Sequence, residues 1–159
     1  MKKLNAGLTA ILFSILLIAG IFTQPNEIFA EDTSPVIVQS KQSFDNTVLE
    51  IRKLVKQNGM MVLSEVNQGK ILSMTGLSVK AVSLFVGNPQ IGNKLFNADH
   101  GVGIAVPVRL NIYEGKDGKT YINYVKPSDQ LASFENDNIQ KIGRNLDKKL
   151  SMLTGMLSK

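Results

Sequence analysis

Cysteine is absent from the 159-residue chain, and histidine occurs once, as His100. The absence of cysteine excludes disulfides, thiolate metal sites, thiol nucleophiles and covalent c-type haem attachment. A single histidine without cysteine makes a poor transition-metal site, so neither a metal centre nor another cofactor is expected. The alternative that stays open is copper bound by His100 with Met60, Met61 or Met74, although methionine beside apolar stretches is more often part of a core.

A strong charge of one sign is also absent. The formal net charge is +5, and the basic residues are scattered rather than gathered on one face with interleaved aromatic residues. We therefore expect no nucleic-acid partner. Hydrophobic residues make up 43% and charged residues 19% of the chain, which is ordinary for one folded domain of this length.

The one long apolar run lies at the N-terminus, where residues 6–22 follow the cationic start Met1-Lys2-Lys3. This pattern predicts a signal peptide within residues 1–30, with cleavage after Ala30. Ile28 fits the cleavage site poorly, so an uncleaved membrane anchor stays open as the alternative. In both cases residues 31–159 are exported, and the domain is periplasmic, extracellular or tethered to the outer side of the cytoplasmic membrane. Membrane contact is expected through that segment if it is uncleaved, and contact of the basic face of the last helix with anionic lipid stays open as a further alternative.

Hydrophobic periodicity predicts the elements of the domain. We expect strands over residues 36–38, 60–66, 81–86, 104–113 and 119–125, and helices over 44–58, 68–75, 91–98 and about 136–157. From Ile104 to Tyr113 apolar side chains alternate with others, and Asp117-Gly118 is a strong signal for a hairpin after that strand. Pro107 lacks a donor N–H, which places its strand at a sheet edge or at a bulge. The prediction is an α+β domain with a mixed or mostly antiparallel sheet, packed by two to four helices that include the long C-terminal one.

Several motifs occur in an order that resembles a known family. They are the turn Gly87-Asn88-Pro89, the strand Val106-Pro107-Val108-Arg109-Leu110-Asn111-Ile112-Tyr113-Glu114, and the Asp117-Gly118 hairpin. Together they resemble the family called domain of unknown function 302 over about residues 35–132, with the C-terminal helix as an extension. The resemblance implies a compact α+β domain that is often a homodimer and has no established activity. Many members carry an Asp-His pair where this chain has Asn67-Gln68, so chemistry that needs that histidine is not expected here.

The polar face of the predicted hairpin carries the main candidates for ligand binding. Arg109, Asn111 and Tyr113 project to the same side of their strand, and the facing strand adds Tyr121 or Tyr124. Arg109 presents a planar fork of donors for a carboxylate or phosphate, beside tyrosines on which an organic ligand can stack.

Two further considerations apply to these candidates. An ion pair between Arg109 and Glu65 or Glu114 would instead give the arginine a structural role. Asn88 joins the ligand-binding candidates because the turn at residues 87–89 precedes a helix N-terminus, which can hold an anion weakly.

Two function classes remain. The first is a non-catalytic, dimeric, exported module that binds a small anionic ligand or an envelope protein across the polar face of its sheet. The second is a small enzyme that uses Glu65 or His100 as acid or base while Arg109 holds an anionic substrate. The chain has no G-x-S-x-G elbow for acyl transfer and no complete P-loop for a nucleotide.

Overall fold

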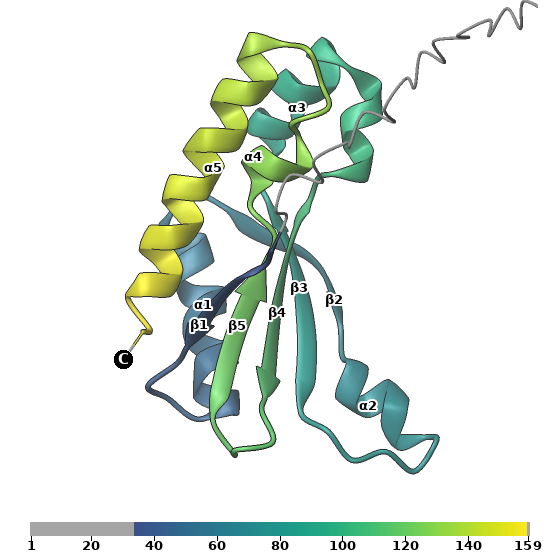
Figure 1. Ribbon diagram of the computed structural model, residues 1–159, viewed down its shortest axis with the longest axis vertical. Coiled ribbons are helices and arrows are strands. Elements are labelled where there is room, and N and C mark those ends of the chain that lie inside the picture. Colours follow the sequence, from purple (N-terminus) through teal and green to yellow (C-terminus); the bar gives the residue numbers. More distant parts are fainter. Residues whose placement is uncertain (1–33, 159) are drawn as a thin grey trace, which may run out of the picture.

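The structure is a computed structural model that describes residues 34–158 (Figure 1), so the predicted signal peptide or anchor lies outside the described residues. Five strands form one sheet in the order β1-β5-β4-β3-β2, and every neighbouring pair is antiparallel. The strands are β1 (Val36–Gln39), β2 (Met61–Val66), β3 (Ala81–Gly87), β4 (Val108–Glu114) and β5 (Thr120–Tyr124). The predicted α+β class is confirmed, with an antiparallel sheet.

Four of the helices were predicted and a short fifth, α4, was not. They are α1 (Phe44–Gln57), α2 (Gln68–Ser73), α3 (Pro89–Ala98), α4 (Pro127–Gln130) and α5 (Asp137–Gly155), with a 3-10 helix η1 (His100–Ile104) after α3. Asparagine defines three of the helix starts, because Asn67, Asn88 and Asn136 each accept hydrogen bonds from backbone N–H groups of the first turn.

The helices divide between one face of the sheet and its ends. Figure 1 shows α5 running from beside α3 and α4 down along the sheet toward α1, with α3 and α4 gathered beyond one end of the sheet and α2 at the other end beside β2. Ile51 and Val55 of α1 and Leu150 and Leu153 of α5 pack on one face of β3, β4 and β5 in the main core. Among residues 34–158 no long helix packs on the opposite face of the sheet, and we call it the open face.

A second, smaller apolar cluster lies beyond the end of the sheet. Leu95 of α3, Val102 of η1, Leu131 after α4 and Ile139 of α5 form it. Because α5 contributes to both clusters, this one amphipathic helix joins the two parts of the core. The sequence pattern over 136–157 predicted its apolar stripe correctly.

The predicted strand over 104–113 begins too early. Ile104 ends η1 and is 89% exposed, whereas the pattern predicted that it faces the core. The strand starts at Val108, directly after Pro107, which has no N–H to offer the ladder. Pro107 thus lies before the strand and not at a bulge within it, and the predicted edge position is wrong because β4 is the central strand of the sheet.

From Val108 onward the predicted alternation is correct. Val108, Leu110 and Ile112 are buried in the main core, while Arg109 and Asn111 face the other way. Asp117-Gly118 turns the chain into β5 with Gly118 at φ 73°, a backbone conformation that suits glycine. Within residues 34–158 no helix is both long and apolar enough to cross a membrane.

Gly69 allows α2 to lie close to the chain that leads into β3. A Cβ at this position would overlap the carbonyl oxygen of Val79, whereas a Cβ at Gly92 in α3 would have no atom within 4 Å. We predict that Gly69→Ala lowers the free energy of unfolding by about 1–3 kcal/mol, because backbone must shift. Gly92→Ala is the matched control and should raise it by up to about 1 kcal/mol through helix propensity. Urea denaturation of both variants measures the difference, and equal effects of the same sign would contradict the close packing of α2.

Candidate functional site

The open face carries a polar hollow of about 420 Å³. Side chains or backbone from the sheet, from α2, from η1 and from α4 line it: Pro35, Gln68, Ser83, Phe85, Ile104, Pro107, Arg109, Asn111, Asn123, Tyr124, Val125 and Gln130. Strands β3, β4 and β5 provide its floor, and the neighbouring segments provide its walls. Two of the predicted ligand-binding residues, Arg109 and Asn111, therefore lie in one cavity.

A row of hydrogen-bonded polar side chains crosses the floor of this polar hollow. The Gln68 amide Nε2 donates to Ser83 Oγ at 2.5 Å, Ser83 Oγ lies 3.4 Å from Asn111 Oδ1, and Asn111 Nδ2 donates to Asn123 Oδ1 at 2.9 Å. The other amide atom, Gln68 Oε1, is buried and accepts no hydrogen bond from the described residues. The row therefore presents the amides of Asn111 and Asn123 to the hollow, whereas Gln68 Oε1 is covered by its neighbours.

Arg109 carries the positive charge of the polar hollow. Its side chain is exposed on β4, opposite Phe85 of β3. The two carboxylates that could have neutralised it are paired elsewhere: Glu65 with Arg52 of α1, and Glu114 with Lys80 at 2.8 Å. Within the part of the chain that the structure describes, Arg109 makes no ion pair, and its guanidinium donors remain available.

The tyrosines of the predicted site go to different places. Tyr113 and Tyr121 stack on each other on the open face with ring centroids 5.5 Å apart, and neither lines the polar hollow. Tyr124 borders the hollow, but its side chain belongs to the main core on the other side of the sheet. Burial raises the pKa of the Tyr124 hydroxyl, while a hydrogen bond with the Thr154 side chain acts in the opposite direction. Of the two tyrosines considered for the facing strand, Tyr121 is the one on the open face.

The structure does not bring together the three residues of the enzymatic alternative. Glu65 pairs with Leu84 in the sheet register, so its side chain points to the helix-covered face, away from Arg109. His100 is exposed at the start of η1 and does not line the polar hollow. In the described residues no group of three or more histidine, aspartate or glutamate side chains is placed to hold a metal ion.

Sequence reasoning missed four polar residues of the hollow. Asn123 could have been predicted from the sequence, because the Asp117-Gly118 hairpin places Asn123 directly opposite Asn111. Ser83 looked like one polar residue in a buried strand, and Gln68 and Gln130 come from helices whose positions only the tertiary fold defines. Gln68 stands where many relatives are expected to have histidine, and it lies at one end of the hydrogen-bonded row.

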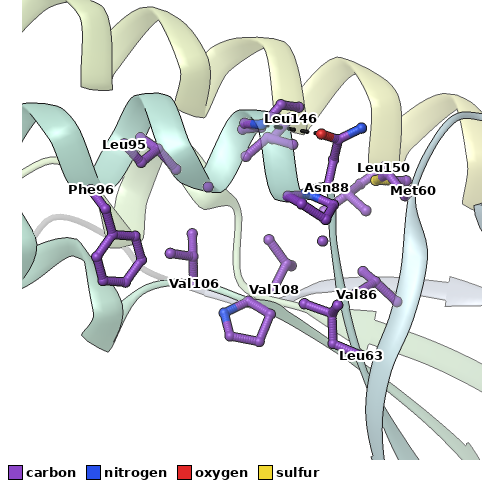
Figure 2. Close-up of a pocket in the computed structure, with 15 residues that line it drawn as sticks. Met60, Leu63, Val86, Asn88, Leu95, Phe96, Val106, Val108, Leu146 and Leu150 are labelled. Atoms are coloured by element: carbon purple, nitrogen blue, oxygen red, sulfur yellow. Dashed lines mark hydrogen bonds between the residues drawn. The ribbon is translucent and has the colours of Figure 1, made fainter.

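A second cavity, the apolar pocket, lies on the other side of Pro107 and measures about 360 Å³ (Figure 2). Its lining comes from β2 to β4, α3 and α5: Met60, Leu63, Val86, Gly87, Asn88, Pro89, Ile91, Gly92, Leu95, Phe96, Val106, Pro107, Val108, Leu146 and Leu150. Asn88, predicted to bind a ligand, lies here instead of in the polar hollow. Its Oδ1 accepts from the N–H groups of Gln90 and Ile91, and its Nδ2 donates to the Gly59 carbonyl at 2.6 Å.

Comparison with known proteins gives one family. Residues 36–157 match the model described as domain of unknown function DUF302. The match therefore includes α5, which was expected to lie beyond the shared part. A crystal structure of an uncharacterized conserved DUF302 protein from Bacillus stearothermophilus has a similar fold, with a TM-score of 0.72 and 24% identity over 77% of this chain and 97% of that one.

Curated proteins also match part of the chain. Over 98 residues it is 29% identical to the fluoride-specific ion channel FluC 1 of Brucella suis and, at the same level, to FluC 1 of Brucella abortus. These residues are 61% of this chain but only 39% and 36% of the two channels. The chain thus spans less than two fifths of the length of those relatives.

The polar contacts at the hairpin end of the open face predict a pH effect. The hydroxyl of Tyr121 donates to Asp117 Oδ2 at 2.7 Å, and this bond, with the N–H of Lys119, lowers the pKa of the Asp117 carboxyl. The stability that it contributes is present above the ordinary carboxyl pKa of about 3.9 and is lost as the pH falls through the lowered value. We predict that Tyr121→Phe raises the pKa of Asp117 toward its ordinary value in a carbon-detected NMR titration. Tyr113→Phe is the control, and an equal rise in that variant would contradict the assignment.

Proposed function

The chain belongs to the family described as domain of unknown function DUF302, and from this premise we propose that it is a non-catalytic module that binds a small anionic ligand in the polar hollow. The observation that carries the proposal is the unpaired Arg109 guanidinium at a cavity floored by amide and hydroxyl groups. Arginine binds carboxylates and phosphates through paired, charge-assisted hydrogen bonds. The volume of about 420 Å³ lies in the range of small-molecule sites.

The amide groups of the polar hollow indicate which groups a ligand should carry besides its anionic group. Asn111 and Asn123 each carry an amide that can donate and accept. A suitable ligand combines an anionic group at Arg109 with at least one hydroxyl or amino group that reaches these amides. A small hydroxy acid, an amino acid or a phosphorylated polyol has this combination.

Binding is favoured over catalysis by what lines the polar hollow. No aspartate, glutamate, histidine or lysine is among its lining residues in the described chain. General acid–base chemistry needs such a group within hydrogen-bonding distance of the reacting atoms. With Glu65 on the opposite face and paired to Arg52, the geometry favours a site that holds its ligand unchanged.

The proposal includes export, because residues 1–30 have the pattern of a signal peptide or anchor. The protein is therefore best made from its full sequence in an exporting bacterial host. Intact mass measurement of the purified product tests export directly. A mass that starts at Glu31 supports cleavage after Ala30, a full-length protein in the membrane fraction supports an anchor, and a full-length cytosolic protein contradicts both.

The ligand proposal predicts the behaviour of Arg109→Gln. Calorimetric titration with acetate, lactate, inorganic phosphate and fluoride covers the anion classes, with fluoride included because two curated relatives are named as fluoride channels. For a probe that binds the native protein, Arg109→Gln should weaken affinity roughly tenfold to a hundredfold, as expected for loss of a charged hydrogen-bond donor worth about 1.5–3 kcal/mol. Arg144→Gln changes an exposed arginine of α5 outside the hollow; it is the matched control and should bind as the native protein does. Equal affinities in both variants would contradict the proposed site.

We also propose that two copies of the chain associate through an apolar surface formed by β2 and α2. Edge strand β2 has no neighbour on its outer side in the described chain, and it contains no lysine or proline that would block pairing. Exposed apolar side chains continue from it along α2 and into the following segment: Met61, Leu63, Val66, Ile71, Met74, Leu77 and Val79. Contiguous apolar surface of this kind is typical of an interface.

The proposed interface predicts a change in mass. Light scattering after size exclusion should give a dimer for the native chain and a monomer for Met74→Lys, because Met74 is 81% exposed within this surface. Leu49→Lys provides the control, since Leu49 is exposed on α1, outside that surface, and should leave the dimer intact. A native monomer would refute the association, and a dimer retained in Met74→Lys would place it elsewhere.

A further inference from the structure

The apolar pocket between α3, α5 and the ends of β2, β3 and β4 is too large to be a packing irregularity. It measures about 360 Å³, on the order of ten times the volume of about 30 Å³ that a water molecule occupies in the liquid. Protein interiors are packed as tightly as organic crystals, and voids larger than a water molecule are few. This pocket lies where the two apolar clusters approach each other. Leu146 lines it from α5, between Ile139, which packs in the smaller cluster, and Leu150, which packs in the main core.

The chemistry of the lining restricts what can enter. Asn88 is the only residue with a polar side chain on the lining, and its amide oxygen and nitrogen are both already hydrogen-bonded to backbone groups. Water that enters from the open rim finds no free polar side chain on these walls, so an apolar group that displaces it is favoured. Figure 2 shows Leu95 and Phe96 on α3 on one side of the cavity, with Val106, Val108 and Leu63 on the side of the strands. A hydrocarbon group is the occupant that leaves no polar atom unsatisfied.

From these observations we infer that the apolar pocket is a binding site for the alkyl chain of a single-chain amphiphile. At about 30 Å³ per methylene, the volume that a water molecule takes up, the cavity accommodates a chain of roughly ten to twelve carbons. A second chain of the same length would exceed this volume.

The rim of the apolar pocket allows the polar end of such a molecule to stay in water. Leu63 is 51% exposed and Phe96 is 41% exposed, so the cavity opens to solvent between β2 and α3. Pro107 is exposed and borders both the apolar pocket and the polar hollow. The inference for the apolar pocket does not depend on the proposed anion site, because only apolar walls hold the alkyl chain.

Gly92 provides a way to fill the apolar pocket without disturbing its walls. It lies in α3 on the lining, and a Cβ there would have no atom within 4 Å, so Gly92→Leu extends into the open space. Gly155 in α5 also has open space around its Cβ and is not on the lining, which makes Gly155→Leu the matched control.

Calorimetry with decanoate and with 1-decanol, each below its solubility limit, tests the inference. Both probes should bind the native protein and the Gly155→Leu control, and Gly92→Leu should weaken both roughly tenfold or more because the chain loses its space. Equal affinity for native protein and Gly92→Leu would overturn the site, as would no binding of either probe to the native protein. Loss of decanoate alone in Arg109→Gln, with 1-decanol retained, would show that the anion site acts separately on the head group.

Methyl NMR of the native protein provides a second readout that depends on no variant. Addition of 1-decanol should shift the methyl signals of Leu95, Val106 and Leu146, which line the apolar pocket, and leave those of Leu49 on α1 unchanged. Shifts confined to the exposed residues of β2 and α2 would overturn the inference, because the alcohol would then coat the apolar surface and not enter the cavity.

Discussion

The fixed register of β3, β4 and β5 is the constraint on which the rest of the structure depends. In these strands alternate side chains point to opposite faces, so burying Leu84, Leu110, Ile112 and Ile122 on one face places Ser83, Arg109, Asn111 and Asn123 on the other. Each buried aliphatic side chain contributes about 1.5–3 kcal/mol relative to exposure. A slip of one residue would exchange the two faces, so the energy that builds the core also fixes the polar row of the open face.

Helix α5 adds the second constraint, because it links this core to the cluster around α3 and η1. Leu150 and Leu153 pack on the sheet, while Ile139 packs beyond its end, and the apolar pocket lies between these contacts. Asn88 fixes the start of α3 beside the pocket, because it caps this helix and donates a hydrogen bond to the Gly59 carbonyl. The elements that line the apolar pocket are therefore well anchored, by their packing in the two clusters and by the hydrogen bonds of Asn88.

The sequence predicted those parts of the fold that local patterns control. The apolar stripe of α5, the starts of α1 and α2 and the Asp117-Gly118 hairpin follow from periodicity and turn chemistry. The start of β4 was not predicted correctly, because residues 104–106 continue the apolar alternation. In the structure Gly101 and Gly103 belong to a 3-10 turn, and Ile104 points to solvent. Alternation alone does not distinguish a strand from a short turn of the same composition.

The candidate site divides in the same way. Arg109 and Asn111 could be found because they share one face of one strand, and Asn123 because the hairpin fixes its partner. The positions of Gln68 and Gln130 depend on helices that pack from elsewhere, and the choice of ion-pair partners for Glu65 and Glu114 depends on α1 and on Lys80. No local pattern contains that information.

The measurement that tests the central claim most directly is a nitrogen-15 NMR titration of the side-chain amides with lactate, which has a carboxylate and a hydroxyl. If the polar hollow binds such ligands, the NH₂ signals of Gln68, Asn111 and Asn123 and the Nε signal of Arg109 shift together, with one saturation curve. The NH₂ signals of Asn88 and Asn97, which lie outside the hollow, should stay in place. No shift at the four hollow residues at saturating lactate, or shifts only at residues outside the hollow, would contradict the assignment of the open face as the binding site.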